Sequence, residues 1–236
     1  MAQYTGRGVH GQTVEIIAGR ILAGEIAEGS TINLAALQEE LDISLTVMRE
    51  ALKVLTAKGL VDARPKRGTF VRPRAAWNLL DADVIRWQFA GGADASLLDQ
   101  LHEVRAIMEP AAARLAAARA TDDDLAALDA ALAQMADAQD DPAAAVAADL
   151  NFHRALLHAA HNEWLERMKV VMETGLAERD KLVHGAQHHD DPVPSHQAVV
   201  AAIRARDAAA AERAMGDLLD KAAQDVDHVR KQKDTR

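Results

Sequence analysis

The sequence predicts a mainly α-helical protein made of a basic N-terminal module and an acidic, all-helical C-terminal module. Apolar residues recur at helical spacing along most of the 236 residues, and alanine is abundant while aromatic side chains make up only 3%. Residues 1–74 hold ten Lys/Arg and eight Asp/Glu, net +2, whereas residues 75–236 hold seventeen and twenty-eight, net −11. The opposite signs indicate two domains with different partners, and the chain is long enough for each to bury a core.

Three helices are expected in the basic module. The first begins at Val9 and the second covers residues 34–41, and each has one apolar face. Ser44 can cap the third helix, in which Ala51 and Leu55 face inward. The outward positions of this third helix are Thr46, Arg49 and Lys53.

Two short strand-like runs follow, Leu60–Arg64 and Thr69–Arg72, joined by a turn with two cations at its tip. Residues 49–74 hold eight Lys/Arg and two acids in a chain whose formal charge is −9, which is typical of a surface that faces phosphates. We therefore predict a winged helix-turn-helix DNA-binding domain over residues 1–74. The residues expected to contact double-stranded DNA are Thr46, Arg49, Lys53, Arg64, Lys66, Arg67, Gly68 and Thr69.

Residues 75–95 are expected to form a connecting helix, because no cluster of Pro, Gly or Ser lies in the middle of the stretch from Ala75 to Gly92. An antiparallel helical bundle is predicted over residues 96–228, followed by a charged tail, 229–236, that is expected to fray. One bundle helix is expected from Trp164 to about His184. The packing face of the connecting helix would carry Trp77, Leu80, Val84 and Trp87. Other helices would start at Thr121, Asp141, Ser195 and Asp207.

Two polar residues occupy inward positions of the helix that follows Asp141. Asp149 and His153 are four residues apart and share one face, and His196 lies where a later helix could bring it to the same place. Two imidazoles and one carboxylate suit a divalent ion such as Zn²⁺, Ni²⁺ or Mn²⁺. The alternative is a hydrogen-bonded Asp/His pair with His196 as an ordinary first-turn residue.

Arg105 also falls on an inward stripe, where a guanidinium needs an acid. Its partner would be Glu109 or another structural carboxylate, or else the carboxylate of a bound small molecule, which Arg can hold with two parallel hydrogen bonds. The histidine-rich run 188–191 is interpreted as a solvated loop rather than a second metal cluster.

Other features exclude several classes of protein. The chain has no cysteine, which rules out disulfides, thiolate metal sites and a cysteine nucleophile. There is no apolar run long enough to cross a bilayer and no signal-peptide pattern, so a cytoplasmic location is expected.

Several motifs are distinctive in both halves of the chain. The N-terminal half contains MREAL at 48–52, KGLV at 58–61 and RPKRGTFV at 64–71. The C-terminal half contains EVRAIMEPAAARLAA at 103–117, DLNFHRALLHAAHN at 149–162 and SHQAVVAAI at 195–203. Together these motifs resemble those of the GntR family of bacterial transcription regulators, in particular the FadR branch with its all-helical FCD effector domain. The stretch WNLLDADVIRW at 77–87 is most similar to a subgroup of sugar-acid repressors that includes a D-galactonate-responsive one.

The resemblance implies a homodimer that binds an inverted-repeat operator and an effector pocket that holds a divalent metal. Its metal ligands correspond to Asp149, His153 and His196, and its carboxylate-binding Arg to Arg105. Many members supply another histidine at the position of Leu218, and many have an Arg at the position of Leu45. The departure at Leu218 implies a three-ligand site, and the one at Leu45 implies a different operator sequence or affinity.

We therefore predict a repressor, not an enzyme, that is released from its operator by a small sugar acid or hydroxy-acid resembling galactonate. The alternatives within this class are an activator, or a sensor of lactate, gluconate or an acyl group. The alternative from a different class is a small metal-dependent enzyme, in which the Asp/His/His group would activate a water molecule. A third alternative is an architectural DNA-binding protein whose helical bundle has only a structural role.

Overall fold

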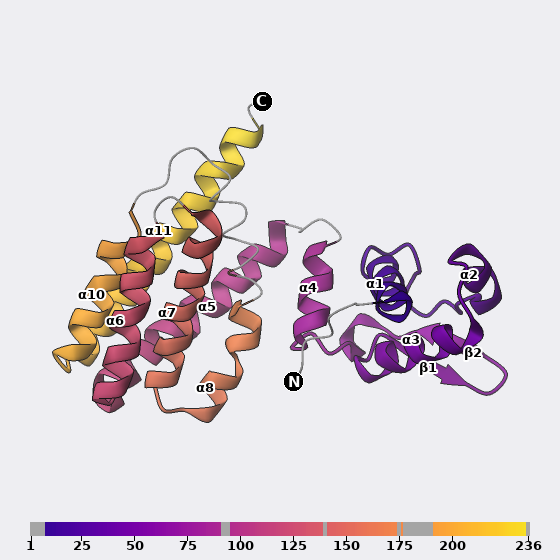
Figure 1. The fold of residues 1–236 in the computed structure, drawn as a ribbon, viewed down its shortest axis with the longest axis horizontal. Coiled ribbons are helices and arrows are strands. Elements are labelled where there is room, and N and C mark those ends of the chain that lie inside the picture. Colours follow the sequence, from indigo (N-terminus) through magenta and orange to yellow (C-terminus); the bar gives the residue numbers. More distant parts are fainter. Residues whose placement is uncertain (1–7, 91–94, 139–140, 174–175, 177–190, 235–236) are drawn as a thin grey trace. The chain divides into compact units, whose positions relative to one another are not determined.

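The computed structural model describes residues 8–90, 95–138, 141–173, 176 and 191–234, and the chain divides into two compact units, residues 1–94 and 95–236 (Figure 1). The predicted fold class is confirmed, because helices dominate both units and the strands of the described residues form one two-stranded antiparallel sheet. Within the same ranges, no helix combines the length and the apolar character needed to cross a membrane.

The first unit is a three-helix core with a β-hairpin and one further helix. The hairpin pairs Val61 with Val71 and Arg64 with Gly68, and a bridge from Thr31 to Phe70 adds one residue of the preceding loop to its edge. We call residues 61–71 the wing. The elements are α1 (Val9–Leu22), α2 (Leu34–Glu40), α3 (Leu45–Ala57), β1 (Val61–Arg64), β2 (Gly68–Val71), η1 (Arg74–Ala76) and α4 (Ala82–Ala90).

The side chains at the start of α2 and α3 explain where these helices begin. The Asn33 side chain accepts a hydrogen bond from the amide of Ala36, and the Ser44 hydroxyl accepts one from Val47. The predicted cap at Ser44 is thus confirmed. Apolar residues of α1, α3 and both strands, among them Ile17, Met48, Leu55, Val61 and Val71, form the core of this unit.

The predicted connecting helix is shorter than expected. Trp77 lies in extended backbone, where its Nε1 donates to the Arg72 carbonyl at 2.8 Å, and Leu80 is exposed, so neither belongs to a helical packing face. The helix α4 begins only at Ala82, because the Asp81 carboxylate accepts the amides of Asp83 and Val84. Only Val84 and Trp87 of the four predicted residues pack from α4.

Gly59 explains why the chain before α4 takes this course. Its φ is +79°, a conformation that suits glycine, and an added Cβ would lie 2.5 Å from the carbonyl oxygen of Ala76. The ammonium of the preceding residue, Lys58, lies 2.7 Å from the carboxylates of both Asp81 and Asp83. The end of α3 is therefore fastened to the start of α4 by backbone approach and by ion pairs.

The second unit is a helical bundle whose neighbours run antiparallel. Residues 120–121 join α5 to α6 and residues 205–207 join α10 to α11, and such short connections reverse the chain. The helix α11 packs along α5, α6 packs on α7, and α10 packs on α11. The helices are α5 (Ala95–Arg119), α6 (Asp122–Asp137), α7 (Pro142–Ala159), α8 (Glu163–Arg167), α10 (Val193–Arg204) and α11 (Ala208–Asp234).

Three of the predicted helix starts in this unit are confirmed. Thr121 and Asp124 form a reciprocal capping box, Asp141 caps α7 with Pro142 in the first turn, and the Asp207 side chain accepts the amide of Ala210. Asp124 has a second role, because its Oδ2 lies 2.8 Å from His161 Nε2 in the turn after α7.

Two other expectations for this unit are wrong. Ser195 is not a cap: α10 already begins at Val193, whose amide donates to Asp191, and the Ser195 hydroxyl donates to the Pro192 carbonyl at 2.9 Å. The helix expected from Trp164 is interrupted at Met168, and most of its remainder lies outside the described residues. The backbone of α11 is helical as far as Asp234, which includes most of the tail that was expected to fray.

Candidate functional site

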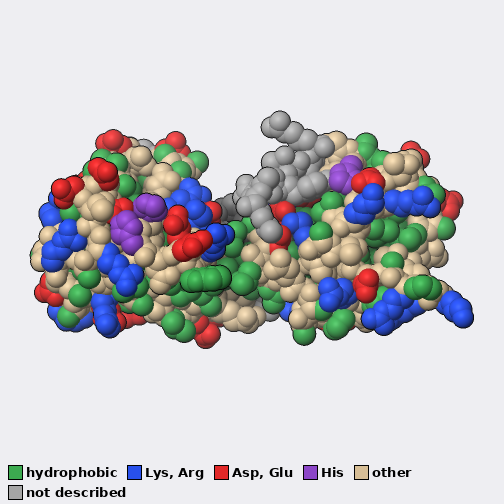
Figure 2. Space-filling model, turned by 90° about the horizontal axis from the view of Figure 1, so that it is seen from below, with side chains coloured by type: hydrophobic (Ala, Val, Ile, Leu, Met, Phe, Trp, Pro, Cys, Tyr) green, Lys and Arg blue, Asp and Glu red, His purple; other side chains and the backbone are tan. Residues whose placement is uncertain are grey.

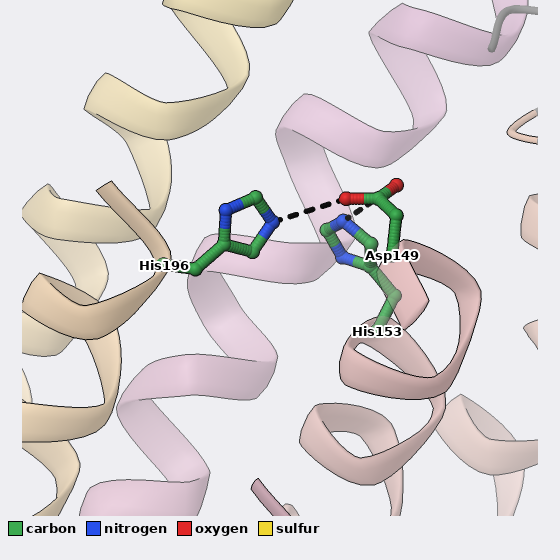
Figure 3. A group of neighbouring side chains, drawn as sticks. All are labelled: Asp149, His153 and His196. Carbon is green, nitrogen blue, oxygen red and sulfur yellow. Dashed lines mark hydrogen bonds and ion pairs between the residues drawn. The ribbon is translucent and has the colours of Figure 1, made fainter. Parts of the chain in front are cut away.

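Three helices of the second unit bring polar side chains to one buried point. Asp149 and His153 come from successive turns of α7, and His196 comes from the first turn of α10 (Figure 3). One donor atom from each of these three side chains lies within 4.8 Å of the other two. We call Asp149, His153 and His196, with Arg105 and Glu109 of α5, the polar centre.

The polar centre is held in an apolar shell. His153 and His196 are buried, and the side chain of Asp149 is 14% exposed. His196 Nε2 lies 3.1 Å from Asp149 Oδ1, and His153 Nε2 lies 3.7 Å from Asp149 Oδ2. The ring of Phe152 meets both imidazoles edge-on, with centroids 5.5 and 4.6 Å away, and so fixes their planes.

The oxygen atom closest to Nδ1 of each imidazole indicates its tautomer. His196 Nδ1 lies 2.8 Å from the Pro192 carbonyl, and His153 Nδ1 lies 2.8 Å from Glu109 Oε2, so in each ring we assign the proton to Nδ1. The Nε2 lone pair of His153 then accepts from Arg105 Nη2 at 3.1 Å, whereas the Nε2 of His196, 3.1 Å from Asp149 Oδ1, needs a second ring proton or a bound cation between the two atoms. This is the arrangement in which a histidine binds a metal through one nitrogen while the other donates to an oxygen.

Arg105 has a structural carboxylate as its neighbour. Its Nε lies 2.6 Å from Glu109 Oε1, and its Nη2 lies 3.4 Å from Glu109 Oε2 and 3.1 Å from His153 Nε2. Of the partners considered from the sequence, Glu109 is therefore the one the structure places there. Arg105 is 5% exposed and Glu109 fully buried.

The ionisation of Glu109 follows from these neighbours. Burial alone would raise its pKa, but the charge of Arg105 and the hydrogen bond from His153 lower the pKa of Glu109 to about 2. Glu109 is therefore an anion that connects the guanidinium of α5 to the imidazole of α7. A carboxylate that is buried and ionised must keep both partners to remain so.

A small cavity of about 10 Å³ borders the polar centre beside His153. That volume holds about one water molecule, which is far less than a sugar acid occupies. A ligand of that size would therefore need the side chains that line this cavity to move before it could enter it. The cavity is lined by Leu150, His153, Arg154, Leu157, Met172 and Leu176, together with Lys169 and Glu173.

The residues expected to contact DNA lie in the first unit, on α3 and the wing. Thr46, Arg49 and Lys53 are exposed on α3, and Lys53 lies 2.6 Å from Glu50. Figure 2 shows Lys and Arg side chains gathered along one edge of this unit. On the wing, Arg64, Lys66, Arg67 and Gly68 are exposed and Thr69 is half-buried.

The two cations at the wing tip have different surroundings. Lys66 is exposed and has φ +67°, whereas the Arg67 guanidinium lies 3.6 Å from the centroid of the Phe70 ring and donates to the Gly29 carbonyl at 2.7 Å. Leu45, the first residue of α3, is an exposed apolar side chain next to Thr46.

Comparison with known proteins identifies both units. Residues 10–71 match the family described as bacterial regulatory proteins, gntR family, and residues 100–221 match the FCD domain. This chain belongs to the gntR family of bacterial regulators. The relatives found for this gntR-family regulator are transcription regulators, and it is a regulator rather than an enzyme.

Two curated relatives cover most of the regulator. The galactonate operon transcriptional repressor of Escherichia coli is 36% identical over 199 residues, 83% of this chain and 86% of that protein. An uncharacterised HTH-type transcriptional regulator of Mycobacterium tuberculosis is 35% identical over 198 residues, 83% of this chain and 80% of that protein. Among solved structures, Lar, titled as controlling the Listeria monocytogenes agr system, aligns with a TM-score of 0.64 at 16% identity over 94% of this chain and 98% of that one, which shows the fold alone.

The structure of this gntR-family regulator also shows what sequence reasoning missed. Glu109 was considered only as a partner of Arg105, which lies four residues earlier on the same helix face, and its contact with His153 of α7 was missed. The Pro192 carbonyl carries no such signal, because it is a backbone group. Leu218 is buried in the bundle core with Met215 and Leu219, and the histidine-rich run 188–190 lies outside the described residues.

Proposed function

We propose that this regulator is a homodimeric repressor that leaves an inverted-repeat operator when a small sugar acid or hydroxy-acid binds at the polar centre. One observation carries the proposal: two imidazole lone pairs and a carboxylate converge beside a buried Arg105–Glu109 pair in the FCD domain. The relative named as a galactonate operon repressor supports a galactonate-like acid as the ligand.

The donor set fits a divalent metal ion. Asp149 offers a carboxylate oxygen, His153 and His196 each offer Nε2, and the assigned tautomers leave those nitrogens unprotonated. Two nitrogens and one oxygen without sulfur suit Zn²⁺, Ni²⁺ or Mn²⁺. A bound ion of this kind would supply positive charge and open coordination positions for the oxygens of an acid. Asp149, His153 and His196 are the residues that would hold it.

Arg105 is the proposed partner of the carboxylate of the ligand. Its guanidinium already holds one buried carboxylate, that of Glu109, and a planar fork can bind a second in the same way. The cavity of about 10 Å³ supports a coupling between binding and movement, since an acid could occupy it only if the side chains that line it shift.

The proposed DNA-contacting surface consists of α3 and the wing. A recognition helix places its N-terminal residues against base edges in the major groove, which assigns this part to Thr46 and Arg49. Lys53, Arg64 and Lys66 would bind phosphates, and the two copies of a homodimer would read the two half-sites. The wing residues proposed to serve DNA binding, by contact or by positioning, are Arg64, Lys66, Arg67, Gly68 and Thr69.

An in vitro selection from a random duplex library tests the DNA half of this proposal. The wild-type chain should enrich an inverted repeat, and the selected duplex then serves as the probe for candidate ligands. Failure to enrich any sequence would contradict a sequence-specific regulator.

A competition experiment tests the ligand half. Galactonate, gluconate, lactate and related acids should be added to the complex with the selected duplex, with and without Zn²⁺, Ni²⁺ or Mn²⁺. At least one acid should release the DNA, and Arg105→Ala should abolish that release. An acid that tightens the complex would instead indicate an activator, and no effect from any acid would contradict the proposed class of ligand.

A further inference from the structure

The turn at the wing tip places a lysine where a glycine is favoured. The amide of Arg67 donates to the Arg64 carbonyl at 3.2 Å, which makes residues 64–67 a turn with Pro65 in its second position and Lys66, φ +67°, in its third. Positive φ in the third position of a Pro-containing turn favours glycine, because any other side chain crowds its own backbone. Lys66 is exposed, so packing does not explain why a lysine occupies this position.

Arg67 is fixed by contacts within the unit. Its guanidinium lies over the buried ring of Phe70, 3.6 Å from the centroid, and donates to the carbonyl of Gly29 in the loop between α1 and α2. The same loop pairs with β2, since the Gly29 amide donates to Val71 at 2.9 Å and the Ile32 amide donates to Thr69 at 2.8 Å. Arg67 therefore adds a side-chain contact at Gly29 to a backbone ladder that joins the loop to the wing.

We infer that the two adjacent cations of the wing have different roles: Lys66 contacts a DNA phosphate, and Arg67 positions the wing. The inference rests on the proposed DNA-binding function. Backbone strain at an exposed residue is maintained where the side chain is used, and Lys66 directs a compact point charge outward from the tip. Arg67 uses the two properties that lysine lacks, a planar face for Phe70 and a fork for the carbonyl of Gly29.

Salt-dependent binding to the duplex selected by the wild-type chain separates the two roles, with the full-length protein at 25 °C. Each lost phosphate contact reduces the slope of log K against log salt by about 0.9. Lys66→Ala should lose that amount, and Lys66→Arg should retain it. Lys66→Gly should show the same loss of slope as Lys66→Ala while raising the Tm by about 2–4 °C, because the turn is relieved of strain.

The Arg67 variants should behave in the opposite way. Arg67→Ala should lower the Tm by about 4 °C and weaken binding about threefold, with the salt slope unchanged, because the wing loses its position rather than a phosphate contact. Arg67→Lys keeps the charge but lacks the planar fork, so it should not restore binding. This failure of rescue is the readout that a mere phosphate contact would not give.

Two results would overturn the inference. One is an Arg67→Ala variant that loses about 0.9 of slope at unchanged Tm and is rescued by Arg67→Lys. The other is a Lys66→Ala variant with an unchanged slope. A wild-type chain that binds no duplex would contradict the proposed function itself and with it the role of Lys66, whereas the Tm changes at Arg67 would still test the positioning contact.

Discussion

Arg105 is the residue on which both the stability and the ligand response of the polar centre depend. Replacing it with Ala leaves Glu109 as a buried anion without its guanidinium, which should lower the free energy of unfolding by about 3–5 kcal/mol. Urea denaturation of Arg105→Ala at pH 7 measures this loss. The double variant Arg105→Met, Glu109→Gln should recover part of it, because no charge then remains buried; a double variant as unstable as Arg105→Ala would show that the ion pair is not the cause.

Asp124 should make the second unit sensitive to acid. Burial would raise its pKa, but hydrogen bonds from the Thr121 amide and hydroxyl and from His161 lower the pKa of Asp124 to about 2. Because the folded state holds the proton less tightly than the unfolded chain, this stabilisation is complete above about pH 4 and is lost as the pH falls towards 2.

The variant Asp124→Asn tests that dependence. It should lower the free energy of unfolding by about 2 kcal/mol at pH 7 and by much less near pH 2, as measured by denaturant titration across that range. Asp129→Asn is a suitable control, since Asp129 is half-exposed and its pair with Arg204 lies on the surface. Equal effects of Asp124→Asn at pH 7 and pH 2 would contradict the assignment.

At this scale the sequence predicted which residues meet but not how they bond. The spacing of Asp149 and His153 determines that they share a face of α7, and an inward Arg105 on a neighbouring helix follows from the same periodicity. The orientation of each imidazole depends on Glu109 and on the Pro192 carbonyl, which come from different segments. Only the packed bundle brings those oxygens to the rings.

At the scale of elements, Gly59 fixes the path from α3 to α4. Gly59→Ala should destabilise the first unit by about 2–4 kcal/mol, because the new Cβ would be 2.5 Å from the Ala76 carbonyl at a φ of +79°. Gly24→Ala is the matched control: Gly24 has φ +77° but nothing within 4 Å of an added Cβ, so only the backbone cost of about 1 kcal/mol applies. Thermal unfolding of both variants measures the difference, and equal losses would show that the close approach does not matter.

Helix boundaries were predictable where one local side chain sets them. Ser44, Thr121 and Asp141 act on amides two or three residues away, so the sequence alone contains the necessary information. Asp81 caps α4 just as locally, but the extended path of the chain before it was not predictable, because that path depends on Lys58 and Gly59 more than twenty residues earlier. The interruption of the helix at Met168 was not predictable either, because no Pro or Gly lies there.

At the scale of the whole molecule, a divalent metal should stabilise the chain through the second unit. At 100 times its Kd, Zn²⁺, Ni²⁺ or Mn²⁺ should add about 2.7 kcal/mol, which corresponds to a Tm increase of a few degrees. His196→Ala should abolish the increase measured by thermal shift. His158→Ala, which changes an exposed histidine outside the polar centre, should retain it. An increase that survives His196→Ala would place the ion elsewhere in the protein.

The opposite charges of the two halves of the chain were readable from composition and spacing, and so was the division into a DNA-binding and a helical part. The volume of the cavity beside His153 could not be predicted from the sequence, because it depends on how side chains such as Leu157, Met172 and Leu176 fill that region. Periodicity states which residues face inward but says nothing about the volume they leave.

The net charge of the polar centre affects which ligands it can bind. With neutral imidazoles and an ionised Asp149, the two carboxylates would contribute −2 and Arg105 +1, so these five side chains would sum to −1 and would repel a carboxylate. One divalent cation would change the sum to +1 and turn repulsion into attraction. Acid and cation would then strengthen each other's binding by the same factor, as thermodynamic linkage requires. A regulator built in this way would respond to the product of two concentrations, and its operator would be released only in cells that contain both.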